Sequence, residues 1–395
     1  SHGCFNGPDG RLYWCDGYHG HEFNDDDGRV TSKRNGSYLF SCRTDGSDVQ
    51  IHCGGGMDNP VEVDFTDQGE MIGSVNIIYS RPRVDALVHW LYGGVYPHRE
   101  RILEETKVTG DFLEPMHRFG HVAVSGVTRY RSGTIDHRWQ DNFFVTFFNS
   151  GKVVRVELER DGASFHASQR EFLSSRNRDF HPTDVIEDAD GSLLVVDTGG
   201  WFYRGCPTSQ MSKPDVLGGI YRIRRDGMTP QVDPRGQRIS WDEIEPNALV
   251  KLFNDTRHAV REKAIDVCAQ RGLEMLPSLS RTPKSDVRVR QNALWALTRM
   301  VADNPQSEVI RKLIRAFLDD RKDQIRLTAC RSLSTYPDQL ATVRLIELLG
   351  DFSPAVRREA ATALGRIGDT KAVSELLAAL STASAGDRTE EHALI

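Results

Sequence analysis

The chain has 395 residues, of which 38% are hydrophobic and 27% are charged, and its formal net charge is −6 at pH 7. This length suggests two or three domains that each bury a core of their own. No apolar run approaches the ~18 residues that a membrane-spanning helix needs. Residues 1–245 hold 27 Lys and Arg against 37 Asp and Glu, and residues 246–395 hold 23 against 19. Neither half shows the concentrated basic face that is typical of nucleic-acid binding.

Residues 1–240 alternate short β-branched and aromatic runs with turns rich in Gly, Asp and Asn. Asp9-Gly10, Asp67-Gln68-Gly69 and Asp190-Gly191 each place such a turn before an apolar run, which is the pattern of a strand and hairpin. Repeated four-stranded sheets separated by turns of this kind are typical of a β-propeller. The region has enough chain for about four blades of ~40 to 60 residues. We therefore expect residues 1–240 to be a partial β-propeller whose N-terminal blades are missing from this chain.

The seven cysteines form no C-x-x-C motif, so the sequence indicates neither a zinc ribbon nor an attached haem. Cys4 and Cys15 flank a turn that could place them on facing strands. They could form a disulfide there or remain buried thiols.

From about Pro246 the apolar residues recur every three or four positions, as on amphipathic helices. The repeated unit is a Val-Arg or Ile-Arg pair with an alanine three residues after the Arg; the four alanines are Ala264, Ala293, Ala329 and Ala360. Acidic residues precede three of the pairs by three or five positions, where a carboxylate can cap a helix; they are Asp255, Asp286 and Asp351. Stacked helix pairs of this period form an α-solenoid. Residues 246–395 resemble HEAT repeats, the last of them truncated, and such a solenoid either binds a protein partner or buttresses the neighbouring domain.

Further motifs follow one another through the strand-rich half. Residues 7–96 contain GPDGRLY, RTDG, DNPVEVDF and GGVY, and residues 181–218 contain HPTDV, DTGGW, CPTSQ and KPDVLG. The first set resembles the glucose/sorbosone dehydrogenase propellers, which are six-bladed and carry pyrroloquinoline quinone and calcium. The second set is similar to planctomycete-type "membrane-bound dehydrogenase" proteins, in which HEAT repeats follow the propeller and a c-type cytochrome domain often follows those. The resemblance implies a sugar or polyol substrate, a periplasmic location and a c-type cytochrome as the partner of the solenoid.

The resemblance also implies where catalysis occurs. The family's base is a His a few residues before the GPDG turn, which falls just before Ser1, and His2 lies slightly out of that register. His181 and Asp184 stand at the mouth of a predicted strand, where propeller sites converge. The alternatives are a surface histidine for His2 and a turn-capping role for Asp184.

Cofactor contacts are expected from Asn59, Arg118 and Arg204, with Trp201 stacking on a sugar or a quinone. The alternatives are surface salt bridges for the arginines and an aromatic plug for Trp201. Where the family has Arg-Asn-Pro, this chain has Asp58-Asn59-Pro60, so an anion stands where a cation meets the quinone.

Asp25 and Asp27 lie in an oxygen-rich loop that ends in glycine, as in calcium sites, although a solvated acidic turn has the same composition. Two functions remain open at this point. The first is a quinone-dependent dehydrogenase of sugars or polyols that passes electrons to a haem partner. The second is a non-catalytic scaffold whose propeller binds a glycan or a protein and whose HEAT arm docks a partner.

Overall fold

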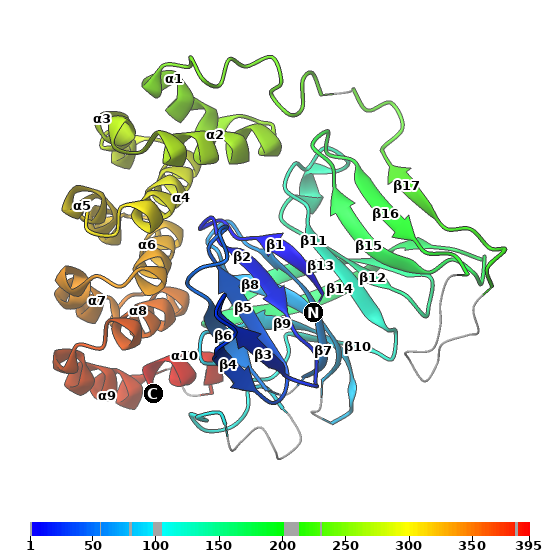
Figure 1. The fold of residues 1–395 in the computed structure, drawn as a ribbon, viewed down its shortest axis with the longest axis horizontal. Coiled ribbons are helices and arrows are strands. Elements are labelled where there is room, and N and C mark those ends of the chain that lie inside the picture. The colour runs from blue at the N-terminus through cyan, green and yellow to red at the C-terminus, as the bar shows by residue number, and fades with distance from the viewer. Residues whose placement is uncertain are drawn as a thin grey trace.

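The computed structural model describes residues 2–55, 57–78, 81–97, 105–200, 213–229, 231–383 and 386–395. Strands occupy the part up to Ile223, and α-helices begin at Pro246. Figure 1 shows the sheets lying beside a curved stack of helices. The predicted change from antiparallel sheets to helices is therefore confirmed.

Three four-stranded sheets, one three-stranded sheet and one two-stranded hairpin are formed by the described residues. Sheet 1 contains β1 (His2–Asn6), β2 (Leu12–Cys15), β5 (Tyr38–Cys42) and β6 (Gln50–Gly54), and β3 (His21–Asn24) pairs with β4 (Val30–Arg34) as a hairpin between β2 and β5. Sheet 2 contains β7 (Met57–Phe65), β8 (Met71–Ile78), β9 (Val84–Trp90) and β10 (His117–Gly120). Sheet 3 contains β11 (Val124–Arg129), β12 (Phe143–Phe147), β13 (Lys152–Asp161) and β14 (Ser164–Ser174). Sheet 4 contains β15 (Pro182–Glu187), β16 (Leu193–Asp197) and β17 (Gly219–Ile223).

The first strands of successive sheets lie side by side, and we call β1, β7, β11 and β15 the inner strands. Glu62 and Asp64 on β7 accept hydrogen bonds from the backbone N–H groups of Val127 and Arg129 on β11, each at 2.7 Å. The equal steps of two residues show that these strands run parallel. Successive propeller blades are arranged in this way. Closure of a wheel and the number of blades stay predictions.

The helices form the second part of the chain. They are α1 (Pro246–Lys251), α2 (His258–Arg271), α3 (Leu276–Leu279), α4 (Val287–Asp303), α5 (Glu308–Ala316), α6 (Asp323–Thr335), α7 (Thr342–Leu348), α8 (Pro354–Ile367), α9 (Val373–Thr382) and α10 (Arg388–Leu394). The repeated Val/Ile-Arg units fall on α2, α4, α6 and α8, and their four alanines are completely buried. We call α2, α4, α6, α8 and α10 the inner helices, and α1, α3, α5, α7 and α9 the outer helices.

The capping role expected of the acidic residues is wrong, because no side-chain capping bond is made at the start of α2, α4 or α8. Asp255 and Asp351 lie two residues before the N-cap and accept a loop N–H instead. Three of the four signature arginines bind a carboxylate further along the solenoid; the pairs are Arg290–Asp320 at 2.8 Å, Arg326–Asp351 at 2.7 Å and Arg357–Glu390 at 2.5 Å. These ion pairs connect successive repeats from α4 onward.

The hydrophobic cores of the two parts do not mix. One core cluster contains only residues of the helices, and three others contain only residues of the sheets. Cys4 and Cys15 lie on the paired strands β1 and β2, as expected, but as free thiols. The contact between the sheets and the helices must therefore be polar in large part.

The inner helices contact the sheets at the ends of the inner strands where the Asp-Gly turns lie, and we call this end the turn end. Arg299 of α4 donates to the carbonyl of Pro8 at 2.9 Å, and Trp295 donates to that of Asp67 at 2.8 Å. Further along, Arg358 of α8 donates to Glu70 at 2.9 Å. The inner face of the solenoid is thus occupied by this protein's own sheets.

Candidate functional site

The end of the inner strands opposite the turn end, which we call the start end, carries several of the predicted residues. Asn59 is the third residue of β7, and His181 immediately precedes β15. His2 begins β1, but its side chain lies outside the described residues. Trp201 and Arg204 also lie outside the described residues, so their roles stay predictions.

One ring nitrogen of His181 is fixed by hydrogen bonds, and none of the described residues hydrogen-bonds to the other. Its Nδ1 lies 2.8 Å from the carbonyl oxygen of Gly199 and 3.1 Å from that of Asp179. Carbonyl oxygens only accept, so the proton is on Nδ1, and Nε2 of the neutral ring keeps its lone pair. The ring also lies 4.7 Å from that of Phe148. His181 is therefore suited to accept a proton or a donor hydrogen at Nε2.

Two carboxyl groups flank the inner strand β11. Asp184 on β15 lies beside Gly126, where a Cβ would be 2.6 Å from the Asp184 Oδ1. Glu62 approaches from β7 on the other side. Burial, and after it the negative charge of Asp184, raises the pKa of Glu62 to about 8. Burial raises the pKa of Asp184 to about 6. Both groups can therefore exchange protons near neutral pH.

Glu62 is a site residue that the motif argument missed. The segment Val61 to Phe65 alternates apolar and acidic residues, and its apolar members are buried. A period of two turns Glu62 and Asp64 away from the sheet core, toward the neighbouring inner strand. This alternation was the available signal for Glu62.

None of Arg118, Asp25 and Asp27 lies on an inner strand. Arg118 is on β10, the outermost strand of sheet 2, and forms an ion pair with Glu114. Asp25 and Asp27 lie in the turn between β3 and β4, where Asp25 accepts the N–H groups of Asp27 at 3.1 Å and Arg29 at 2.8 Å. Within the part of the chain that the structure describes, no group of three His, Cys, Asp or Glu side chains could hold a metal ion. Calcium at Asp25 and Asp27 stays a prediction.

The described inner strands fit pyrroloquinoline quinone poorly. Their charged side chains are five carboxylates and one arginine, Arg129. That arginine is already bound by Asp67 at 2.8 Å and by Asp141 at 2.5 Å. A ligand with several carboxylates would meet like charges here, which is repulsive.

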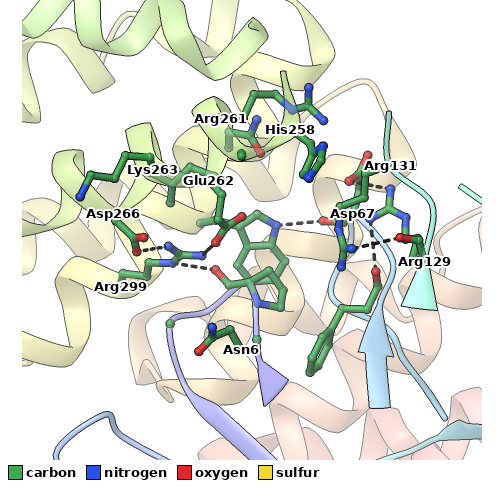
Figure 2. A pocket seen from close by; sticks show the side chains of 18 of the residues that line it. Asn6, Asp67, Arg129, Arg131, His258, Arg261, Glu262, Lys263, Asp266 and Arg299 are labelled. Carbon is green, nitrogen blue, oxygen red and sulfur yellow. Dashed lines mark hydrogen bonds and ion pairs between the residues drawn. The ribbon is translucent and has the colours of Figure 1, made fainter. Parts of the chain in front are cut away.

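At the turn end, a cleft of about 690 Å³ lies between the sheets and helices α2 and α4. Figure 2 shows charged side chains entering it from both sides. The sheets contribute Asp67, Arg129 and Arg131, and the helices contribute Glu262, Asp266 and Arg299, among others. Phe65 and Trp295 are almost completely buried and form apolar lining.

Two arginines of this cleft are buried, and each forms ion pairs with two carboxylates that are more exposed than the arginine itself. The side chain of Arg299 is 8% exposed and binds Asp266 at 2.5 Å and Glu262 at 2.6 Å, and these carboxylates are 48% and 57% exposed. Arg129 holds in the same manner Asp67, which lines the cleft, and Asp141, which does not. The nearby carboxylates raise the pKa of Arg299, although its burial acts in the opposite direction. The cleft therefore presents carboxylates that are held in place and whose negative charges are largely neutralised by the buried arginines.

Comparisons with known families agree with this architecture. The model for HEAT repeats matches residues 310–395, so the C-terminal part is of the HEAT class. The model described as "Domain of unknown function (DUF7133)" matches residues 2–225, which is more than half of the chain. This protein belongs to the DUF7133 family. No curated protein matches the chain, and no described helix is long and apolar enough to span a membrane.

Two solved structures show a distant likeness. A "putative oxidoreductase (glucose dehydrogenase)" from Thermus thermophilus is 15% identical over 55% of this chain, with a TM-score of 0.37. A glucose dehydrogenase is 14% identical over 49% of this chain and 78% of its own, with a TM-score of 0.33. The matched region covers 63% of the Thermus protein, which is less than two thirds. These values carry no argument about activity.

Proposed function

We propose that this protein binds a sugar or polyol in the cleft between the turn end and helices α2 and α4. The observation that carries the proposal is the set of exposed carboxylates held by buried arginines. A carboxylate accepts hydrogen bonds from neighbouring hydroxyl groups, and a group that is already fixed loses little freedom on binding. A charged ligand is less suitable, because it would compete with an existing ion pair.

The size and composition of the cleft also support a small polar ligand. Small-molecule sites typically measure about 300 to 1,000 Å³, and this cleft is about 690 Å³. Lys263 and Arg261 on α2 line it as well and can donate to ring or hydroxyl oxygens. Arg261 donates one N–H to the carbonyl of Asp255 at 2.8 Å and another hydrogen bond to Thr256 at 3.2 Å. The lining therefore supplies both acceptors and donors, as a polyhydroxyl ligand requires.

Titration calorimetry with glucose, sorbitol and a short oligosaccharide tests the proposal. We expect at least one probe to bind, and Glu262→Gln to weaken it about tenfold, because a hydrogen bond to a charged group contributes ~1.5 kcal/mol or more. The control is Glu375→Gln on α9, an exposed carboxylate outside the cleft. Equal affinities of the two variants would contradict binding in the cleft. The absence of binding by every probe would contradict a sugar or polyol ligand.

The carboxyl pair of Glu62 and Asp184 favours a second candidate, the dehydrogenase activity implied by the resemblance. The carboxylate of Asp184 would take the proton of a substrate hydroxyl, with Glu62 as the neighbouring proton reservoir. The oxidation also needs a separate two-electron acceptor of the quinone class. Pyrroloquinoline quinone and calcium stay predictions, since the described residues supply no cation that is free of a carboxylate partner on the inner strands.

Reduction of an artificial dye in the presence of an aldose or polyol, with added pyrroloquinoline quinone and calcium, tests this activity. We expect Asp184→Asn to abolish the activity and Asp179→Asn, just upstream of β15, to retain it. Absence of turnover across the substrates, together with absence of quinone binding in an absorbance titration, would exclude the activity for this chain. This result would leave binding in the cleft unaffected.

A redox partner, expected to be a c-type cytochrome, belongs to the same proposal. The inner helices contact the sheets, so a protein partner would bind the outer helices. Exposed apolar side chains on the outer layer include Val309, Val343 and Leu377. The periplasmic location and membership of the planctomycete-type family stay predictions.

A further inference from the structure

The hairpin β3–β4 carries a histidine that hydrogen-bonds to a carboxyl group on one side and a hydroxyl on the other. His21 Nδ1 lies 3.1 Å from Asp16 Oδ2, and His21 Nε2 lies 2.9 Å from Ser32 Oγ. Asp16 follows β2, His21 begins β3, and Ser32 lies within β4. Three short segments of the chain thus bring an Asp, a His and a Ser into one line of hydrogen bonds.

The surroundings hold the histidine in one orientation. Its side chain is 4% exposed and that of Asp16 is 9% exposed. The His21 ring stacks on Phe23 with centroids 4.5 Å apart and meets Phe40 edge-on at 4.8 Å. The other oxygen of Asp16 accepts the backbone N–H of Tyr38 at 2.6 Å. Both the ring and the carboxyl group are therefore fixed before any ligand arrives.

The direction of the hydrogen bonds follows from these partners. An Asp16 carboxylate can only accept, so His21 carries its proton on Nδ1 and accepts from the Ser32 hydroxyl at Nε2. Ser32 remains partly exposed, whereas the other two side chains are buried. A hydroxyl bonded to a base that is oriented by a third group is the arrangement of an activated serine, which is recognised by geometry rather than by sequence position.

We propose that Ser32 is a nucleophile toward short-chain carboxylic esters, with His21 as its general base and Asp16 as the positioning residue. Ser32 Oγ forms a bond to the acyl carbon while its proton passes to His21 Nε2. The proton then passes to the departing alcohol oxygen as the ester bond breaks. Water, deprotonated by His21, displaces the acyl group as the carboxylic acid and restores the Ser32 hydroxyl. This activity is independent of the cleft and of the inner-strand carboxyl pair.

The test uses the full chain with an alkyl fluorophosphonate probe and p-nitrophenyl acetate. We expect intact mass and peptide mapping to place the phosphonyl adduct on Ser32, and Ser32→Ala to abolish both the adduct and ester hydrolysis. The control is Ser47→Ala, an exposed serine whose hydroxyl donates to Asp45 in its own turn. Labelling of Ser32 no faster than of Ser47 would overturn the proposal, and the hydrogen bonds would then serve only to hold the hairpin.

Two further variants separate catalysis from structure. His21→Gln keeps a hydrogen-bonding side chain but removes the base, so we expect an unchanged fold by circular dichroism and a loss of labelling of at least tenfold. Burial raises the pKa of Asp16 to about 7, so the labelling rate of the natural chain should rise through pH 7 as Asp16 ionises. Asp16→Asn should remove this inflection. Retained labelling in His21→Gln, or an unaltered pH profile in Asp16→Asn, would also contradict the proposal.

Discussion

Glu70 joins the sheets to the solenoid through a completely buried carboxylate. Arg160 binds its two oxygens at 2.8 and 2.6 Å, and Arg358 of α8 binds one of them at 2.9 Å. Burial alone raises the pKa of Glu70, but the two guanidinium groups outweigh it and hold the pKa well below its usual range. The charged form of Glu70 is therefore the form that the folded protein stabilises.

Replacing Glu70 by Gln should destabilise the protein by about 3 kcal/mol, because the almost completely buried Arg358 would lose the nearer of its two carboxylate partners and keep only Glu359 at 3.4 Å. Chemical denaturation at pH 7 measures the cost. The control, Glu159→Gln, changes an exposed carboxylate near Arg160 on β13, and should cost less than about 0.5 kcal/mol.

Glu70 also makes the free energy of unfolding depend on pH. Because the folded pKa of Glu70 lies below the unfolded value near 4.5, its stabilisation is complete above that value and is lost as the pH falls below it. The difference in stability between the natural chain and Glu70→Gln should therefore shrink in acid. A difference that stays constant from pH 7 to pH 3 would mean that ion pairing does not account for the cost.

Motifs in the sequence pointed to residues such as His181 and Asn59, whereas the contacts of Glu62 depend on a neighbouring strand. His181 immediately precedes β15, as expected at the mouth of a predicted strand, whereas Asn59 lies within β7, and the functional roles of both stay predictions. Glu62 acts through β11, and no motif names that contact. Asp58 and Glu62 both lie on β7 and make this inner strand acidic, as Asp58 in the motif already indicated.

At the scale of single elements, the repeats of the solenoid were the most predictable part. Each signature alanine lies at a contact between helices, and small buried residues there allow helices to approach closely. Sequence spacing shows the nearness of Asp351 to a helix start but not its partner, Arg326 of the preceding repeat, which binds its carboxylate. Asp255 instead pairs with Arg257, two residues further along.

Ala360→Glu should loosen the solenoid without unfolding the sheets. The change overpacks α8 and buries a charge at a site with no exposure, at a cost of roughly 3 kcal/mol or more. Hydrogen exchange should show lost protection in α6 and α8 and in the turn near Ala163 that Arg358 contacts. The control is Ala378→Glu, at an exposed position of α9.

Hydrogen-exchange protection of the sheet strands in Ala360→Glu shows whether the sheets unfold independently of the solenoid. The sheet cores contain no residue of the helices, so strands such as β12 should exchange as slowly in Ala360→Glu as in the natural chain. Simultaneous loss of protection in β12 and α8 would show that the sheets and the solenoid form one cooperative unit.

For the whole molecule, the order of sheets followed by helices could be read from the change in sequence period, whereas their mutual contact could not. The inner helix α4 carries Gln291, Trp295 and Arg299 at steps of four, which places them on one face toward the sheets. The sequence of such a stripe of polar and aromatic residues does not show whether the helix docks on another protein or on the sheets of its own chain. The cleft at the turn end depends on this docking, so it was equally invisible in the sequence.

The docking also changes which residues the hairpin turns can tolerate. Gly46 and Gly69 both have a positive φ, at +83° and +81°, a conformation that Asn and Asp also adopt in turns. Nothing lies within 4 Å of a Cβ at Gly46, but a Cβ at Gly69 would lie 2.7 Å from the ring of Trp295. Homologues that keep the solenoid should therefore accept Asn at the position of Gly46 and only glycine at that of Gly69. In a homologue without the solenoid, Gly69 would become as replaceable as any other turn glycine.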